Sequence, residues 1–129
     1  MNYLLDTHLL IWAAAEPARL PKAAEELLRR VDCGFFFSAI AVWEIALKRG
    51  RQRPDFGFEP GELRAGFLQR GVHEIAITSR HALELPALPR LHRDPFDRML
   101  IAQARVERMV LLTSDRRLAA YGPPVKVVA

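Results

Sequence analysis

Cysteine is almost absent from this sequence: Cys33 is the only one among 129 residues. A lone thiol cannot form an internal disulfide, and it cannot supply the paired cysteines of a structural zinc site. A disulfide-stapled scaffold and a zinc site built on paired cysteines are therefore both excluded. The low cysteine content fits a reducing compartment, and we expect a cytoplasmic protein.

Long apolar runs are absent as well. The longest early run, residues 9–15, is far shorter than the roughly 20 residues that a membrane-spanning helix needs. The first residues form a strand pattern instead of the basic segment and long apolar segment of a secretory signal. The four histidines lack zinc-like spacing, so we read them as surface or core residues, with His92 at most a substrate contact. We expect no membrane association.

The sequence does contain enough apolar residues for one packed core. Half of its residues are hydrophobic, and a chain of this length normally forms one domain, here predicted to span residues 1–129. The net charge is +4. This basic excess is compatible with an anionic partner such as nucleic acid but does not identify one.

Short apolar runs alternate with helical patterns along the chain. The predicted strands are residues 2–5, 35–37, 73–77, 110–112 and 125–128, and the predicted helices are residues 7–15, 20–31, 39–49, 62–70, 79–85, 95 onward and 116–121. Residues 51–60, with two prolines and a glycine, are predicted to form a loop. This order predicts an α/β fold, a three-layer α/β/α sandwich with a mostly parallel sheet of about five strands.

Two acids follow predicted strands, Asp6 after residues 2–5 and Asp115 after residues 110–112. Ligands of parallel sheets bind beyond the carboxyl ends of the strands, so a shared site is geometrically natural. Each acid also has a simpler interpretation, as the N-cap of the helix that follows it. The sequence leaves both interpretations open.

Two more acids lie in helical segments. Glu44 is the only charged residue in an otherwise apolar helix pattern, so it needs a partner, commonly a buried arginine or a metal. Asp94 followed by Pro95 is typical of a helix start. Asp97 then lies at the third helical position, above an apolar face, where an acid is unfavourable unless it meets a cation or reaches back to cap the helix.

Four converging carboxylates would repel one another strongly if all were ionised, and a divalent cation is the usual remedy. Oxygen ligands without histidine or cysteine favour hard ions, which here means Mg²⁺, with Mn²⁺ as the alternative. Such sites bind phosphate oxygens and activate water for attack on a phosphorus atom. The pattern therefore points towards phosphoryl chemistry.

Four motifs in this order resemble the PIN-domain family, and more narrowly the VapC-type toxins of bacterial toxin–antitoxin pairs. They are Leu4-Leu5-Asp6-Thr7-His8, Ser38-Ala39-Ile40-Ala41-Val42-Trp43-Glu44-Ile45, Asp94-Pro95-Phe96-Asp97-Arg98-Met99-Leu100-Ile101-Ala102-Gln103-Ala104 and Leu112-Thr113-Ser114-Asp115. The resemblance covers nearly the whole chain. It implies a PIN-like α/β/α sandwich and a Mg²⁺-dependent endoribonuclease that hydrolyses RNA with metal-activated water. It also implies a homodimer that is silenced by an antitoxin protein.

Carried over by position, the resemblance implies a catalytic and metal-binding quartet with one supporting hydroxyl, namely Asp6, Glu44, Asp97 and Asp115 with Thr113. Asp94 either joins this site or only caps the helix. Nearby basic residues are candidates for RNA phosphate contacts, above all Arg93, Arg98 and Arg116, with Arg117 beside them and a second group at Lys48, Arg49, Arg51 and Arg53. For each of these, a solvated helix end is the simpler interpretation.

Other Mg²⁺-dependent phosphoryl enzymes fit less well. A haloacid-dehalogenase-type phosphatase needs an acid two residues after Asp6, where this chain has His8. A receiver domain needs an acidic pair near the end of its first strand, which is missing here. From a different class, a non-catalytic binding module would use the same acids only as helix caps and ion-pair partners.

Overall fold

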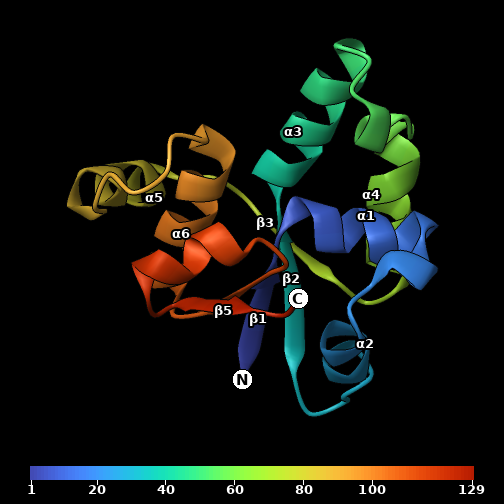
Figure 1. The fold of residues 1–129 in the computed structure, drawn as a ribbon, viewed down its shortest axis with the longest axis horizontal. Helices are drawn as coiled ribbons and strands as arrows, with labels where there is room; N and C mark the ends of the chain where they lie inside the picture. Colours follow the sequence, from blue (N-terminus) through green and yellow to red (C-terminus); the bar gives the residue numbers. More distant parts are fainter.

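The computed structural model describes residues 1–129 and contains one five-stranded sheet in which every neighbouring pair is parallel. The spatial order is β3-β2-β1-β4-β5, so the first strand lies at the centre (Figure 1). The strands are β1 (Asn2–Leu5), β2 (Gly34–Ser38), β3 (His73–Ile75), β4 (Val110–Thr113) and β5 (Val125–Val127). The predicted parallel sheet is confirmed.

Helices cover both faces of this sheet (Figure 1). The α-helices are α1 (Thr7–Ala15), α2 (Lys22–Leu28), α3 (Ala39–Gly50), α4 (Pro60–Gln69), α5 (Ser79–Glu84) and α6 (Pro95–Glu107). Four single-turn or short 3₁₀ segments are η1 (Pro17–Arg19), η2 (Pro54–Phe56), η3 (Leu85–Ala87) and η4 (Arg116–Tyr121). The predicted three-layer sandwich is therefore confirmed.

The alternation of side chains along β1 divides the core between the two faces. Tyr3 and Leu5 belong to a buried cluster that also contains residues of α1 and α4, whereas Leu4 packs with residues of α6 on the other face. This follows from the two-residue period of a strand, which sends successive side chains to opposite sides. A central strand buried on both faces fixes where its last residue, and the acid after it, must lie.

Helix caps set the start of the helices that carry the candidate acids. The Ser38 hydroxyl accepts a hydrogen bond from the Ile40 N–H at 3.0 Å, which starts α3. Asp94 starts α6 in the same way, with Pro95 at the first helical position as predicted. Both helices thus begin at the same end of the sheet as the α1 N-terminus, next to the carboxyl ends of β1 and β2.

Residues 51–60 connect α3 to α4 as the predicted loop, but this loop is more ordered than its composition suggests. The segment contains η2, and Phe56 is only 3% exposed because it packs into the same core cluster as Leu63 and Phe67. Helix α4 also begins at Pro60, where the Glu59 carboxylate accepts hydrogen bonds from the Gly61 and Glu62 N–H groups. Although the segment contains two prolines and a glycine, it packs against the core through Phe56.

None of the helices combines the length and the apolar character needed to cross a membrane.

Candidate functional site

The carboxyl ends of the two central strands bring the first and last predicted acids together. In the β1–β4 register Leu5 lies opposite Leu112, Asp6 follows β1 directly, and Asp115 comes two residues after the end of β4. The strands that carry these acids are therefore direct neighbours, which the sequence could not establish. Parallel strands end at the same edge of a sheet, so both acids reach the same region.

Asp6 is both a helix cap and a member of this site. Its Oδ1 accepts a hydrogen bond from the Leu9 N–H at 2.9 Å, while its Oδ2 accepts from the Thr113 hydroxyl at 2.5 Å and from the Ser114 N–H at 3.3 Å. Asp6 is 6% exposed. Burial raises the pKa of its carboxyl, and these hydrogen bonds oppose that rise.

Helix α6 contributes two acids with different roles. The Asp94 Oδ1 accepts from the Phe96 N–H at 2.8 Å and from the Asp97 N–H at 3.2 Å, so Asp94 caps the helix as predicted. The Asp97 Oδ2 instead lies 2.9 Å from the His92 Nε2. Burial, followed by the charge of Asp94, raises the pKa of Asp97 to about 6, although His92 acts in the opposite direction.

Glu44 is buried on α3, and both of its oxygens have partners. Its Oε1 accepts from the Thr7 hydroxyl at 2.6 Å, and its Oε2 pairs with the Lys48 ammonium one helical turn further on. The sequence had suggested an arginine or a metal. The partner is a lysine because residues four apart lie on one face of a helix.

Asp115 is held by a fork-like ion pair. Its Oδ1 accepts from the Arg117 backbone N–H and from the Arg117 Nε at 3.0 and 3.1 Å, and its Oδ2 accepts from the Nη2 at 2.9 Å. These contacts lower the pKa of the Asp115 carboxyl. The Asp115 N–H donates to the Thr113 hydroxyl at 3.0 Å, so Thr113 connects Asp115 to Asp6.

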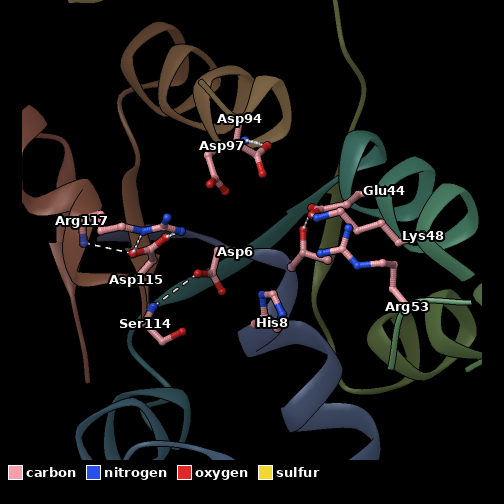
Figure 2. Close-up of a pocket in the computed structure, with 11 residues that line it drawn as sticks. Asp6, His8, Glu44, Lys48, Arg53, Asp94, Asp97, Ser114, Asp115 and Arg117 are labelled. Atoms are coloured by element: carbon pink, nitrogen blue, oxygen red, sulfur yellow. Dashed lines mark hydrogen bonds and ion pairs between the residues drawn. The ribbon is translucent and has the colours of Figure 1, made fainter. Parts of the chain in front are cut away.

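All of these acids line one cavity of about 230 Å³ (Figure 2). None of its lining residues is hydrophobic; they are Asp6, Thr7, His8, Glu44, Lys48, Arg53, Asp94, Asp97, Ser114, Asp115 and Arg117. The cavity is thus lined by five carboxylates and by three lysine or arginine side chains. In Figure 2 the acids lie around the central Asp6, with Asp94 and Asp97 from α6 on one side and Glu44 from α3 on another. The structure brings the predicted quartet together, and Asp94 joins it.

A hard divalent cation fits this donor set. Asp94 and Asp97 each keep one carboxylate oxygen without a hydrogen-bond donor, and none of Asp6, Asp94 and Asp97 pairs with lysine or arginine. His92, Asp94 and Asp97 also present ligand atoms within 4.8 Å of one another. Oxygen-rich sites with at most one imidazole suit Mg²⁺ and Mn²⁺.

Of the arginines proposed as RNA contacts, Arg53 and Arg117 line the cavity, whereas the three that were favoured, Arg93, Arg98 and Arg116, do not. Arg93 and Arg116 are exposed, and contact of either with RNA stays a prediction. Arg98 has a structural role, because its guanidinium donates to the carbonyls of Pro89 at 2.9 Å and Leu85 at 3.3 Å. Its N–H groups hold the segment before α6, which leaves fewer of them for a phosphate.

Sequence reasoning missed the part that two histidines take in the site. His8 lines the cavity, although it was read as a surface or core residue, and His92 contacts Asp97, although it was considered at most a substrate contact. Nothing local in the sequence places His92 against Asp97. The sequence named Lys48, Arg53 and Arg117 only as candidates for phosphate contacts, and all three line the cavity.

A family model for the PIN domain matches residues 3–122. Among curated proteins, Ribonuclease VapC22 of Mycobacterium tuberculosis is 33% identical over 122 residues, which are 94% of this chain and 92% of that protein. The range of the family model includes every acid of the cavity.

Solved structures share the fold at lower identity. A VapBC2 complex from Rickettsia felis, bound to a promoter DNA fragment, matches with a TM-score of 0.73 and 16% identity over 98% of this chain and 97% of that one. DNA-bound VapBC from Salmonella typhimurium gives 0.66 and 16% over 98% and 96%. A toxin–antitoxin complex from Klebsiella pneumoniae gives 0.64 and 19% over 98% of both chains.

Proposed function

The chain belongs to the PIN-domain family, and from this membership we propose that it is a metal-dependent endoribonuclease, the toxin of a toxin–antitoxin pair. The name of its relative at 33% identity, Ribonuclease VapC22, supports RNA as the substrate class. We propose Mg²⁺ as the cofactor, with Mn²⁺ able to replace it. The reaction is hydrolysis of an RNA phosphodiester bond.

One observation carries this proposal: five carboxylates line a small polar cavity at the carboxyl ends of the central strands. A helix cap or a surface ion pair explains one acid at a time. It does not explain why three buried or part-buried acids without a lysine or arginine partner, Asp6, Asp94 and Asp97, meet in one place, where ionised carboxylates repel one another. A bound cation removes that repulsion.

We assign the metal to Asp6 and Asp97, with Asp94 and Asp115, which line the same cavity, completing its surroundings. Glu44 is less suited than the sequence suggested because, unlike Asp6 and Asp97, it already pairs with a cationic side chain, the ammonium of Lys48. When bound, the cation supplies Lewis acidity and lowers the pKa of water.

The protein's own residues hold this arrangement in place. The Thr113 hydroxyl orients the Asp6 carboxylate, and His92 orients that of Asp97. Partners of this kind fix the direction of a metal ligand and commonly change metal affinity about 10- to 100-fold when they are removed. The cavity is thus prepared for the cation before RNA arrives.

The test is cleavage of a mixed pool of structured RNAs by the purified chain in Mg²⁺, with a chelator and with Asp97→Asn as comparisons. We expect cleavage that the chelator abolishes and that Asp97→Asn reduces at least about 100-fold. Asp32→Asn is the matched control, because Asp32 is an exposed acid paired with Arg30 and does not line the cavity.

Full activity in a folded Asp97→Asn protein would contradict the assignment of the metal. If the wild type neither cleaves RNA nor binds Mn²⁺ by calorimetry, the chain is a binding module and the proposal fails. Equal losses in Asp97→Asn and Asp32→Asn would indicate a general effect of removing negative charge.

The antitoxin and the homodimer belong to the same proposal. The structural relatives from Rickettsia felis and Salmonella typhimurium are VapBC complexes, which supports an antitoxin partner for this chain. Co-expression with the product of an adjacent small gene should yield a complex that cleaves RNA more slowly than the free chain. The mass of the free chain in solution tests the dimer.

A further inference from the structure

We propose that Lys48 is the phosphate-binding group of the cavity, held in place by Glu44, and that it contacts the RNA backbone opposite the metal-binding acids. This inference rests on the proposed ribonuclease function and names the residue that would receive the negatively charged substrate. It changes the role of Glu44 from metal ligand to positioning residue.

The burial of Lys48 is the first observation. Its side chain is 16% exposed, whereas lysine is almost never deeply buried unless it is paired. Its ammonium pairs with Glu44 and lies 5.0 Å from the centre of the Phe56 ring and 5.6 Å from that of the Phe96 ring. Ring faces attract cations, so three groups on different segments fix the position of this charge.

The unused hydrogen-bonding capacity of Lys48 is the second observation. An ammonium has three N–H donors and no acceptor, and only Glu44 accepts one from Lys48. Two donors are therefore left on a side chain that lines the cavity. Phosphate oxygens are acceptors of the matching charge.

The third observation is the presence of a fixed cation beside acids suited to a metal. A cavity that only stored a divalent cation would lose affinity to a nearby positive charge. The arrangement makes sense if the full occupant is a cation together with an anion. Among the other cations of the cavity, Arg53 is exposed and Arg117 is engaged with Asp115, so Lys48 is the part-buried cation that remains.

Glu44 is also explained by this arrangement. The Thr7 hydroxyl fixes one of its oxygens, which leaves the other for Lys48. Thr7 follows Asp6 directly, so the same turn between β1 and α1 positions an acid suited to the metal and, through Glu44, the phosphate-binding lysine.

The experiment uses the double variant Glu44→Gln/Lys48→Met, because Lys48→Met alone would leave a buried, unpaired carboxylate and destabilise the fold. In the double variant the amide of Gln can still accept from Thr7, and Met fills the space between the rings. Lys22→Met is the matched control, since Lys22 is exposed on α2 and does not line the cavity. Lys48→Arg tests whether a cation of another shape suffices.

Three readouts separate the alternatives. We expect Mn²⁺ affinity by calorimetry to stay within about twofold, because Lys48 is not a metal ligand. Cleavage should fall about 100-fold, the usual effect of removing one group that stabilises transition-state charge. Binding of single-stranded RNA in chelator should weaken, with the slope of log affinity against log salt smaller by about 0.7, the value for one lost phosphate contact.

A tighter Mn²⁺ affinity with unchanged cleavage would overturn the proposal, since the Lys48 ammonium would then only neutralise the acids in the absence of the metal. An unchanged salt slope would overturn it too. If the wild type cleaves RNA and the double variant cleaves equally well, this inference alone fails. If the wild type neither cleaves RNA nor binds Mn²⁺, the ribonuclease proposal fails, and the salt slope still decides whether Lys48 binds phosphate. Lys48→Arg should retain the slope.

Discussion

The cavity contains two kinds of acid, and their surroundings differ. Asp6 and Asp97 have no lysine or arginine partner, and burial raises the pKa of both. Asp115 and Glu44 each bind a neighbouring cation on their own segment, and the partner of Asp115 lowers the pKa of its carboxyl. The two acids without such a partner can bind a metal cation from solution. The two paired acids instead hold Lys48 and Arg117 in position at the cavity.

The largest effect should come from Asp6→Asn. It keeps the helix cap, because Asn is as good an N-cap as Asp, but it removes the charge of an unpaired acid. We expect Mn²⁺ affinity to fall at least about 100-fold, the upper end of what a lost supporting residue alone produces. Calorimetry measures it, and an affinity within threefold of wild type would place Asp6 among purely structural caps.

Asp97→Asn should make the metal-free protein more stable, by about 2 kcal/mol at pH 7. The rise in the pKa of Asp97 from 3.8 to about 6 corresponds to about 3 kcal/mol, and its partial exposure to water reduces that figure. Urea unfolding in chelator measures the change. A destabilised Asp97→Asn protein would show that Asp97 is satisfied without a metal.

The pH dependence checks the sign of that effect. The folded protein holds the Asp97 proton more tightly than the unfolded chain does, so wild-type stability falls as the pH rises from about 4 to about 6. The advantage of Asp97→Asn should therefore be absent near pH 4 and complete above pH 6.5. An advantage that does not change with pH would have another cause.

Thr113→Val removes the hydroxyl that orients Asp6 and keeps the shape of the side chain. We expect metal affinity and cleavage to fall about tenfold, the low end for a supporting residue. Thr113→Ser keeps the hydroxyl and is the matched control, expected to stay close to wild type. If Val and Ser behave alike, the hydrogen bond to Asp6 does not hold the carboxylate for the metal.

The smallest effect should come from Asp115→Asn, the same change at a paired acid. Its pKa is lowered, so its contribution to stability is present above the pKa of the unfolded chain and is lost as the pH falls through the lower folded value. Because the Arg117 side chain is 74% exposed, we expect a loss below about 1 kcal/mol at pH 7. A gain in stability, as at Asp97, would erase the distinction between the two kinds of acid.

Patterns within one segment predicted most of the fold. The Asp94-Pro95 start, the Ser38 cap and the alternation of strands and helices each depend on neighbours in the sequence, and all were confirmed. The burial of Phe56 was missed because the prolines and the glycine around it suggested a loop, while its contacts come from distant residues.

The candidate site, too, could be predicted in part from the sequence. The convergence of the predicted acids follows from strand ends and helix starts, which a parallel arrangement brings to one edge. Their different partners depend on side chains: Arg117 and Lys48 lie two and four residues from the acids they bind, within reach of a pattern search. His92 contacts Asp97 through the path of the segment before α6, which spacing alone does not define.

The hydrogen bond from Thr113 to Asp6 joins residues 107 positions apart. During synthesis Asp6 therefore emerges about a hundred residues before the strand that completes its surroundings. A growing or prematurely ended polypeptide therefore carries the first acid without Thr113 and Asp115, and has no finished cavity. Because β4 lies beside β1 in the sheet, the site cannot assemble until β4 has been translated.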